Sequence, residues 1–237
     1  MDFQSTSWSI VRDLRDPLAS GYREALESLV ESYWPPVYAF IRRMGKDVHE
    51  AEDLAQAFFA HVLDRGTFEG VDEAKGTFRS YLRQAIRNFV VSEHRHRSAR
   101  KRSPEGRLVP MEGLEDRLGG GALVAASPEA AFDFQWARDA IARARSRMAA
   151  DCAASGRQLA FDVFDAYLSA YLSGEGPVDY RAIAARFGLE RKKVDNFVYR
   201  GRIAFRNHLR TELVASVSSE EDLRRELDEL ATFLGDA

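Results

Sequence analysis

The stretch FRSYLRQAIRNFVVSEHRHRSARKR, residues 78–102, combines an apolar helical stripe with a dense set of cations. Its apolar residues recur at intervals of three and four, which predicts one amphipathic helix. Eight Arg or Lys residues accompany a single acid, Glu93, so the segment carries +7, whereas the whole 237-residue chain carries −3. Positive charge gathered on one element of an acidic chain indicates a polyanionic partner, and nucleic acid is the first candidate.

The side chains of this helix suit contact with nucleic acid. Exposed aromatic rings can stack on unpaired bases, cations hold phosphates, and an amide can read a base edge. The apolar stripe comprises Phe78, Tyr81, Leu82, Ala85, Ile86 and Phe89, whereas Arg79, Arg83, Arg87 and Asn88 project elsewhere. The alternative is a solvated amphipathic helix whose aromatic rings belong to the core. We interpret His94 and His96 as phosphate or solvent contacts, because no third metal ligand lies near them.

Charge is also segregated along the rest of the chain. Residues 46–73 carry −6, residues 190–210 carry +5, and residues from 212 to the end carry −6. The two basic segments predict two contact points on an extended polyanion. In the first acidic segment Glu52, Asp53 and Gln56 lie clear of the apolar stripe. Such a face is usually solvated, but beside two basic segments it indicates a basic protein partner.

Periodicity is helical nearly throughout, and no run alternates as a strand does, so we predict an all-α fold. A buried stripe from Leu26 to Met44 contains Pro35 and Pro36, which predict a kink or a helix restart. Asp47 and Glu50 form a capping-box pattern for the next helix, which should end near Gly66.

Residues 103–127 hold glycines and prolines that predict a flexible linker between two helical domains. Thr77 precedes the basic helix as a candidate cap, and Ser127 has the same place before the next helix. That helix should run to about Ala153, and another from about Gln158 to Leu172. Asp179 then caps a short helix, Gly188 suits a left-handed turn, and a long basic helix follows, which is the helix-turn-helix pattern.

The second basic helix offers polar groups on one face. Arg191, Lys192 and Lys193 begin it, and Asn196, Tyr199 and Arg200 follow one and two turns later, which suits entry into a major groove. The core side is predicted to hold Val194, Val198, Ile203 and Phe205. A purely structural role for this motif is the alternative, and the +5 balance favours DNA binding.

Composition also limits the class of protein. The chain has no apolar run long enough to span a membrane and no apolar leader after a basic start, so we expect a cytoplasmic protein. A single cysteine, Cys152, cannot form an internal disulfide. No metal-binding carboxylate cluster, phosphate-cradling glycine loop or nucleophile with a base is recognisable, so we predict neither catalytic activity nor a cofactor or metal.

The order of these parts resembles the bacterial RNA polymerase sigma factors of the extracytoplasmic-function class, within the sigma-70 family. YWPPVYAFIRR followed by AEDLAQAFF is similar to the first half of their promoter-melting domain, and FRSYLRQAIRNFVVSEHRHR to its second half. Residues 161–209 resemble their C-terminal promoter domain. The resemblance implies a region 2-like domain (1–102), a linker (103–127), a region 4-like helix-turn-helix domain (128–214) and an appended acidic helix (215–237).

The resemblance also implies roles for single residues. Glu52, Asp53, Leu54 and Gln56 match the helix that grips the clamp helices of core RNA polymerase. The loop 65–76 belongs to the surface that captures a flipped base of the minus-ten element. The matching minus-ten residues are Phe78, Tyr81, Arg83, Arg87, Asn88, His94, Arg95 and Arg97. The minus-thirty-five element would be read by Arg191, Lys192, Lys193, Asn196, Tyr199 and Arg200.

Two features depart from the family pattern. Asp195 stands where a cation is common, which leaves the minus-thirty-five preference open, and Tyr81 replaces a common tryptophan. The acidic tail has Ser218 and Glu221 as a capping box and a leucine seam at Leu223, Leu227, Leu230 and Leu234. Packing against the C-terminal domain is one reading of the tail, and regulation or partner binding is the other.

The predicted function is therefore promoter recognition and DNA opening with core RNA polymerase. The partners would be the polymerase and promoter DNA, and an anti-sigma or other regulatory protein stays open. One rival is a helix-turn-helix regulator that acts without forming a holoenzyme. The other is a nuclease, which metal-dependent DNA cleavage would reveal.

Overall fold

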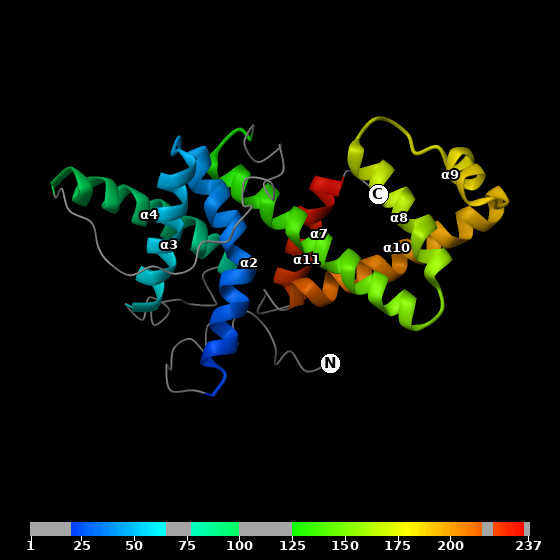
Figure 1. Cartoon of the computed structure of the whole chain (residues 1–237), viewed down its shortest axis with the longest axis horizontal. Coiled ribbons are helices and arrows are strands. Elements are labelled where there is room, and N and C mark those ends of the chain that lie inside the picture. Colours follow the sequence, from blue (N-terminus) through cyan, green and yellow to red (C-terminus); the bar gives the residue numbers. More distant parts are fainter. Residues whose placement is uncertain (1–19, 65–76, 100–124, 215–219, 235–237) are drawn as a thin grey trace. The chain divides into compact units, whose positions relative to one another are not determined.

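The computed structural model describes residues 20–64, 77–99, 125–214 and 220–234, and within them every regular element is a helix (Figure 1). This confirms the all-α prediction. In chain order the helices are α2 (Tyr22–Arg43), α3 (Val48–Asp64), α4 (Phe78–Ala99), α7 (Pro128–Ala154), α8 (Gln158–Ser173), α9 (Tyr180–Phe187), α10 (Arg191–Val214) and α11 (Glu220–Leu234). Among the described residues no helix is both long enough and apolar enough to cross a membrane.

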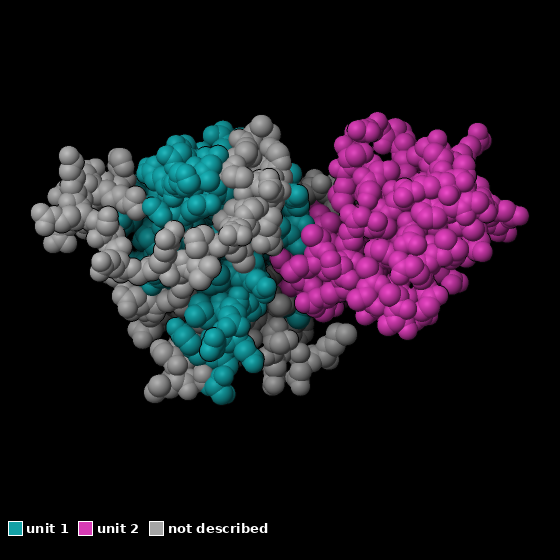
Figure 2. All heavy atoms as spheres, viewed as in Figure 1, with its two compact units in different colours: residues 1–139, 214–226 teal, residues 140–213, 227–237 magenta. Residues whose placement is uncertain are grey.

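The chain forms two compact units (Figure 2). Unit 1 comprises residues 1–139 and 214–226, and unit 2 comprises residues 140–213 and 227–237. The division between the units falls inside α7 and inside α11. The predicted domain 128–214 instead begins where α7 begins and ends where α10 ends. Most of the predicted linker, and the whole predicted loop 65–76, lie outside the described residues.

The core of unit 1 is built by α2, α3 and α4, each of which packs against the other two. Aromatic rings join them. Trp34 of α2 stacks on Phe59 of α3 with ring centroids 5.2 Å apart, and Tyr33 meets Phe78 of α4 edge-on at 5.4 Å. Such pairs contribute about 0.5–1.5 kcal/mol each beyond the area that they bury. Packing between distant segments thus fixes the position of α4.

The sequence predicted a kink or a helix restart at Pro35 and Pro36, and the restart is wrong, because α2 is one helix from Tyr22 to Arg43. The kink stays a prediction. A proline inside a helix loses one backbone hydrogen bond and crowds the preceding turn. Here all residues from 33 to 41 are buried, including both prolines. The packing of this whole segment in the core therefore outweighs the local cost of the two prolines.

The caps predicted at Asp47, Thr77, Ser127 and Asp179 are confirmed, and the one predicted at Ser218 lies outside the described residues. Asp47 accepts a hydrogen bond from the backbone N–H of Glu50 at 2.8 Å, Thr77 from that of Ser80 at 3.3 Å, and Ser127 from that of Ala130 at 3.1 Å. Asp179 caps α9 by accepting from Ala182 and Arg181. These backbone donors hold the pKa of Asp179 below its ordinary value. Each cap fixes where a helix begins.

Unit 2 packs α8 against α9 and places α10 beside α8 through Phe164 and Phe205, whose ring centroids are 5.7 Å apart. The turn between α9 and α10 contains Gly188 with φ +62°, the left-handed conformation that the sequence predicted. Within this unit α7 holds the end of α10, because Arg143 and Arg147 both contact the buried Glu212 at 3.0 and 2.6 Å.

One residue of α10 faces solvent although the sequence predicted it on the core side. Ile203 was expected in the core and is 49% exposed, whereas Val194, Val198 and Phe205 are buried as predicted. The buried stripe runs through Gly201 instead. A Cβ atom there would lie 2.3 Å from Cδ2 and 2.8 Å from Cβ of Phe164, so only glycine lets α10 approach α8 this closely.

We therefore expect Gly201→Ala to destabilise unit 2, although alanine is the better helix former. Forcing an atom into this contact should lower the free energy of unfolding by about 1–3 kcal/mol. Urea denaturation followed by circular dichroism measures it. Asn207→Ala, at an exposed position of the same helix, is the control and should leave stability unchanged or slightly raised. Equal stability of the two variants would contradict the close packing.

Candidate nucleic-acid interface

The predicted minus-ten residues of α4 lie at different depths in unit 1. Phe78 is fully buried, so the structure places it in the core instead of on the surface. Tyr81 is half-buried, and this burial raises its pKa. Arg87 and Asn88 are exposed, and Arg83 is half-buried. The predicted residues His94, Arg95 and Arg97 belong to α4, but their side chains lie outside the described part of the chain.

Arg79 is a cation that the sequence put on the surface and the structure puts inside, with 2% of the residue exposed. Its guanidinium contacts Asp133 of α7 at 2.8 Å and Glu226 of α11 at 2.9 Å. Its Cζ also lies 4.4 Å from the centroid of the Trp136 ring. One buried charge thus joins three segments of unit 1 that are far apart in sequence.

Two further cations of α4 pair with acids of α7. Arg83 contacts the second oxygen of Asp133, and Arg87 contacts Glu129. From Arg83 to Arg87 the residue number rises by four on α4, and from Asp133 to Glu129 the number of the paired acid falls by four on α7. The two helices therefore run antiparallel along this row. We call Arg79, Arg83 and Arg87 with Asp133 and Glu129 the ion-pair row.

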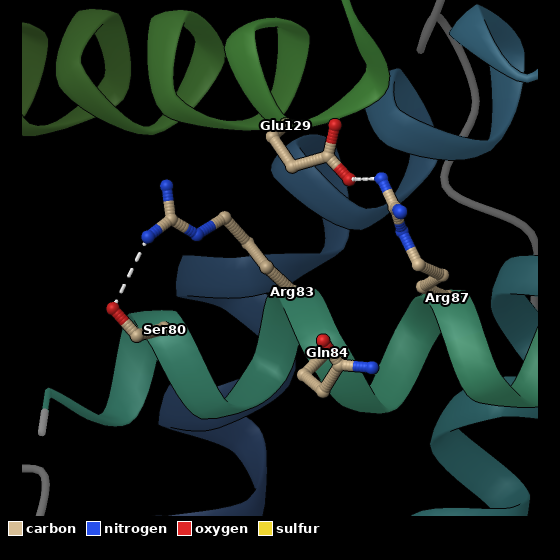
Figure 3. Close-up of a pocket in the computed structure, with 5 residues that line it drawn as sticks. All are labelled: Ser80, Arg83, Gln84, Arg87 and Glu129. Atoms are coloured by element: carbon tan, nitrogen blue, oxygen red, sulfur yellow. Dashed lines mark hydrogen bonds and ion pairs between the residues drawn. The ribbon is translucent and has the colours of Figure 1, made fainter. Parts of the chain in front are cut away.

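A polar groove of 410 Å³ lies along the row (Figure 3). Its lining residues are Ser80, Arg83, Gln84, Arg87 and Glu129. In the close-up Arg83 and Arg87 rise from α4 toward α7, and Glu129 reaches down to Arg87. Arg83 also donates to Ser80 at 3.1 Å, and Gln84 donates to Asn88 at 2.9 Å. Through Gln84, the groove therefore connects Arg83 and Arg87 to Asn88, the residue predicted to read a base.

Glu129 is held in its charged form in this groove. Burial acts to raise its pKa, but hydrogen bonds from its own backbone N–H, Arg87 and Ser127, with the attraction of the Arg87 charge, outweigh burial and lower the pKa. The pKa of Glu129 thus lies below its ordinary value of 4.5. At neutral pH the acid carries the negative charge that the ion pair requires.

Burial falls along the row from Arg79 to Arg87. The side chains of Arg79 and Glu226 are 3% and 2% exposed, whereas those of Arg87 and Glu129 are 53% and 31% exposed. Removing one partner of a buried pair typically costs about 3–5 kcal/mol, because a charge stays buried without compensation. An exposed pair contributes only about 0–1 kcal/mol. The Arg79 end is therefore a fixed anchor, and the Arg87 end is exchangeable.

The predicted polymerase-binding residues lie on α3. Asp53 is exposed, and Glu52 and Gln56 are half-buried. Leu54 is only 2% exposed and belongs to the core, so it supports this face from below instead of forming its surface. His49 lies 4.0 Å from Glu52. The available acidic surface of α3 is thus smaller than the sequence predicted, and Asp53 is its most exposed member.

The predicted minus-thirty-five residues of α10 are all exposed. Lys192, Asn196, Tyr199 and Arg200 share one face by their spacing, and Tyr199 is 67% exposed. Asp195, the departure from the family pattern, forms an ion pair with Arg191 one turn earlier at 3.2 Å. Arg191 also lies over the ring of Tyr180 in α9. This face presents cations, an amide and an aromatic ring together, as a base-reading helix does.

Sequence reasoning missed the acids that pair with α4. Glu129 was interpreted only as a favourable charge at a helix start, and Asp133 and Glu226 were not singled out. One signal existed: Glu129 and Asp133 have the same four-residue spacing as Arg83 and Arg87. Within the described residues, no three His, Cys, Asp or Glu side chains are grouped as a metal site.

Comparison with known protein families now gives these features a context. Residues 29–100 match the family model of sigma-70 region 2. Over this segment the chain is similar to region 2 of sigma-70 family sigma factors. No curated protein and no solved structure matches the chain.

The region 2 match covers most of α2 and all of α3 and α4. It therefore includes the acidic face of α3 and the α4 side of the ion-pair row, but neither α7 nor α10. Region 2 implies binding to core RNA polymerase and to promoter DNA, and it supports a role in promoter melting. Sigma factors initiate transcription without being enzymes themselves.

The buried anchor of region 2 can be tested by stability. Arg79→Met keeps much of the side-chain volume but removes the cation that contacts the buried Glu226, while Asp133 keeps its ion pair with Arg83. We expect a loss of about 3–5 kcal/mol in the free energy of unfolding, measured by urea denaturation at neutral pH. Arg23→Met is the control, since Arg23 pairs with Glu27 on the surface and the side chains are 88% and 67% exposed. Similar small losses for both would refute the anchor.

Proposed function

We propose that this chain is a sigma factor of the extracytoplasmic-function class, which recruits core RNA polymerase to a subset of promoters and opens the DNA there. The region 2 match over α2, α3 and α4 carries the proposal. The exposed basic face of α10, outside that match, supports a second DNA contact of the helix-turn-helix type. The protein would act in the cytoplasm, where polymerase and promoter DNA meet.

On this proposal three helices bind three different partner surfaces. The acidic face of α3, with Asp53 at its surface, binds the clamp helices of the polymerase. Helix α4 binds the minus-ten element through Tyr81, Arg83, Arg87 and Asn88. Helix α10 enters the major groove of the minus-thirty-five element with the exposed residues described above. Two contacts with one DNA molecule raise affinity for promoters in which both elements are present at the right spacing.

DNA opening on this proposal needs no chemistry from the chain. The duplex is in equilibrium with a locally unpaired state, and a protein that binds only the unpaired strand shifts that equilibrium toward the open form. Asn88 is exposed on α4 and hydrogen-bonded to Gln84, which supports it as a group that reads a base edge. Phosphate contacts by nearby cations make the DNA binding sensitive to salt.

The polymerase contact predicts the effect of one charge reversal. Asp53→Lys should abolish co-purification of the full chain with core RNA polymerase at moderate salt, because it places a cation against a basic partner surface. Glu175→Lys is the matched control. It reverses an exposed acid in the turn after α8 and changes the net charge equally. Loss of binding in both variants, or in neither, would remove the assignment to α3.

The wild-type chain in the same assay tests the proposed function itself. A sigma factor should co-purify with core polymerase and direct run-off transcription from a subset of genomic promoters. DNA binding by the chain without polymerase association would favour the rival, a helix-turn-helix regulator that acts alone. That rival leaves the region 2 match unused.

The melting role predicts a selective defect in Asn88→Ala. Initial binding of the holoenzyme to promoter DNA should stay within about twofold, while open-complex formation falls by about tenfold, since a lost base-edge hydrogen bond costs roughly 1–3 kcal/mol. Permanganate reactivity of unpaired thymines measures opening, and a gel-shift assay measures binding. Gln84→Ala removes the hydrogen bond to Asn88 but keeps the Asn88 amide, so it should reduce open-complex formation less than Asn88→Ala does. Equal loss of binding and opening would argue against reading of the unpaired strand.

A further inference from the structure

We propose that the groove beside Arg83 and Arg87 is a site for phosphodiester groups, which Glu129 and Asp133 of α7 occupy in the free chain as internal competitors. Nucleic acid would displace these carboxylates, beginning at the Arg87 end. The identity of the ligand rests on the proposed function. The competition rests on the ion-pair row alone.

The two carboxylates lie where phosphates would have to lie. Arg83 and Arg87 are four residues apart on α4, and Asp133 and Glu129 are four residues apart on α7, so each pair spans one helical turn. A guanidinium binds a carboxylate and a phosphate through the same planar set of N–H donors. The acidic turn of α7 thus offers α4 two negative charges at the spacing of its own cations.

The groove also contains polar side chains that do not pair with the carboxylates of α7. Ser80 and Gln84 also line it, and Gln84 donates a hydrogen bond to the predicted base-reading residue Asn88. A strand whose phosphates replace Glu129 would therefore place its bases toward an amide that can read them. This continuity is what favours a polynucleotide over a free anion as the occupant.

Exchange is favourable only where the internal pair is weak. Arg87 and Glu129 are partly exposed, so water already competes for both groups and little is lost when they separate. Arg79 is buried with Glu226 and Oδ1 of Asp133, and these contacts stay closed while Oδ2 of Asp133 releases Arg83. The row therefore opens from the Arg87 end without unfolding unit 1.

The consequence is suppressed binding of the free chain to nucleic acid. A polynucleotide gains by releasing its own counterions, but it must first displace an attached anion from Arg87, which lowers the apparent affinity. Neutralising Glu129 removes the negative charge that competes for Arg87 and leaves every cation of α4 in place. DNA binding should then become tighter although no contact to DNA is added.

The test compares Glu129→Gln with Glu27→Gln in the full chain. Both changes remove one negative charge from an ion pair with arginine, so they alter the net charge equally. Fluorescence anisotropy with a labelled single-stranded DNA at about 50 and 200 mM salt measures affinity. We expect Glu129→Gln to bind about fivefold or more tightly than wild type, within the usual range of coupling between two sites, and Glu27→Gln to stay within about twofold.

Equal gains in the two variants would show a bulk charge effect and overturn the competition, and no gain in either would overturn it too. Asp133→Asn is a second variant, which should bind at least as tightly as Glu129→Gln. Its thermal unfolding is measured beside it, because Asp133 also contacts Arg79. If that variant unfolds, Glu129→Gln decides alone.

The competition and the proposed function can fail separately. If the wild-type chain forms a transcribing holoenzyme but Glu129→Gln binds DNA no more tightly than Glu27→Gln, only the competition is wrong. If no holoenzyme forms but Glu129→Gln binds DNA more tightly, the competition stands and the sigma function fails.

Discussion

The buried guanidinium of Arg79 is the contact on which the arrangement of unit 1 depends. It brings α4 together with one acid from α7 and one from α11, and its charge lies against the face of Trp136. A buried cation is tolerated only when it is paired and hydrogen-bonded, so these partners are required and not optional. Helix α11, which the sequence presented as an appended acidic tail, thereby supplies the buried Glu226 to unit 1, and Leu223 of the same unit is buried as well.

Local signals in the sequence were sufficient for most of the fold. Caps at Asp47, Thr77, Ser127 and Asp179 and the left-handed turn at Gly188 were predictable because each depends on the hydrogen bonds or backbone angles of a few neighbouring residues. The helix restart at Pro35 and Pro36 and the core position of Ile203 were predicted wrongly, because both depend on packing between helices. Steric space beside Phe164, for example, decides that Gly201 and not Ile203 faces the core, and no local pattern contains that information.

The candidate site was predictable in kind but not in detail. Charge segregation correctly separated an acidic α3 from a basic α4 and α10, yet a charge count cannot tell a free cation from a paired one. On α10 the predicted residues are exposed. On α4 Phe78 is buried, and Arg79, Arg83 and Arg87 are paired with acids from other helices. The partners were missed because they lie 42 to 147 positions away from the cations, and the shared four-residue spacing of two acids and two arginines was the one signal in the sequence.

The gradient of burial along the ion-pair row reconciles two demands on one helix. Helix α4 is held firmly in the fold, and on our proposal its cations must also be available to a polyanion. A row that was buried throughout would hold the helix but could not release its cations, because every separation would leave an uncompensated charge. A row that was exposed throughout would release them but stabilise little. With Arg79 inside and Arg87 at the surface, the fold is anchored at one end of the row, and on our proposal phosphate replaces the carboxylate at the other end.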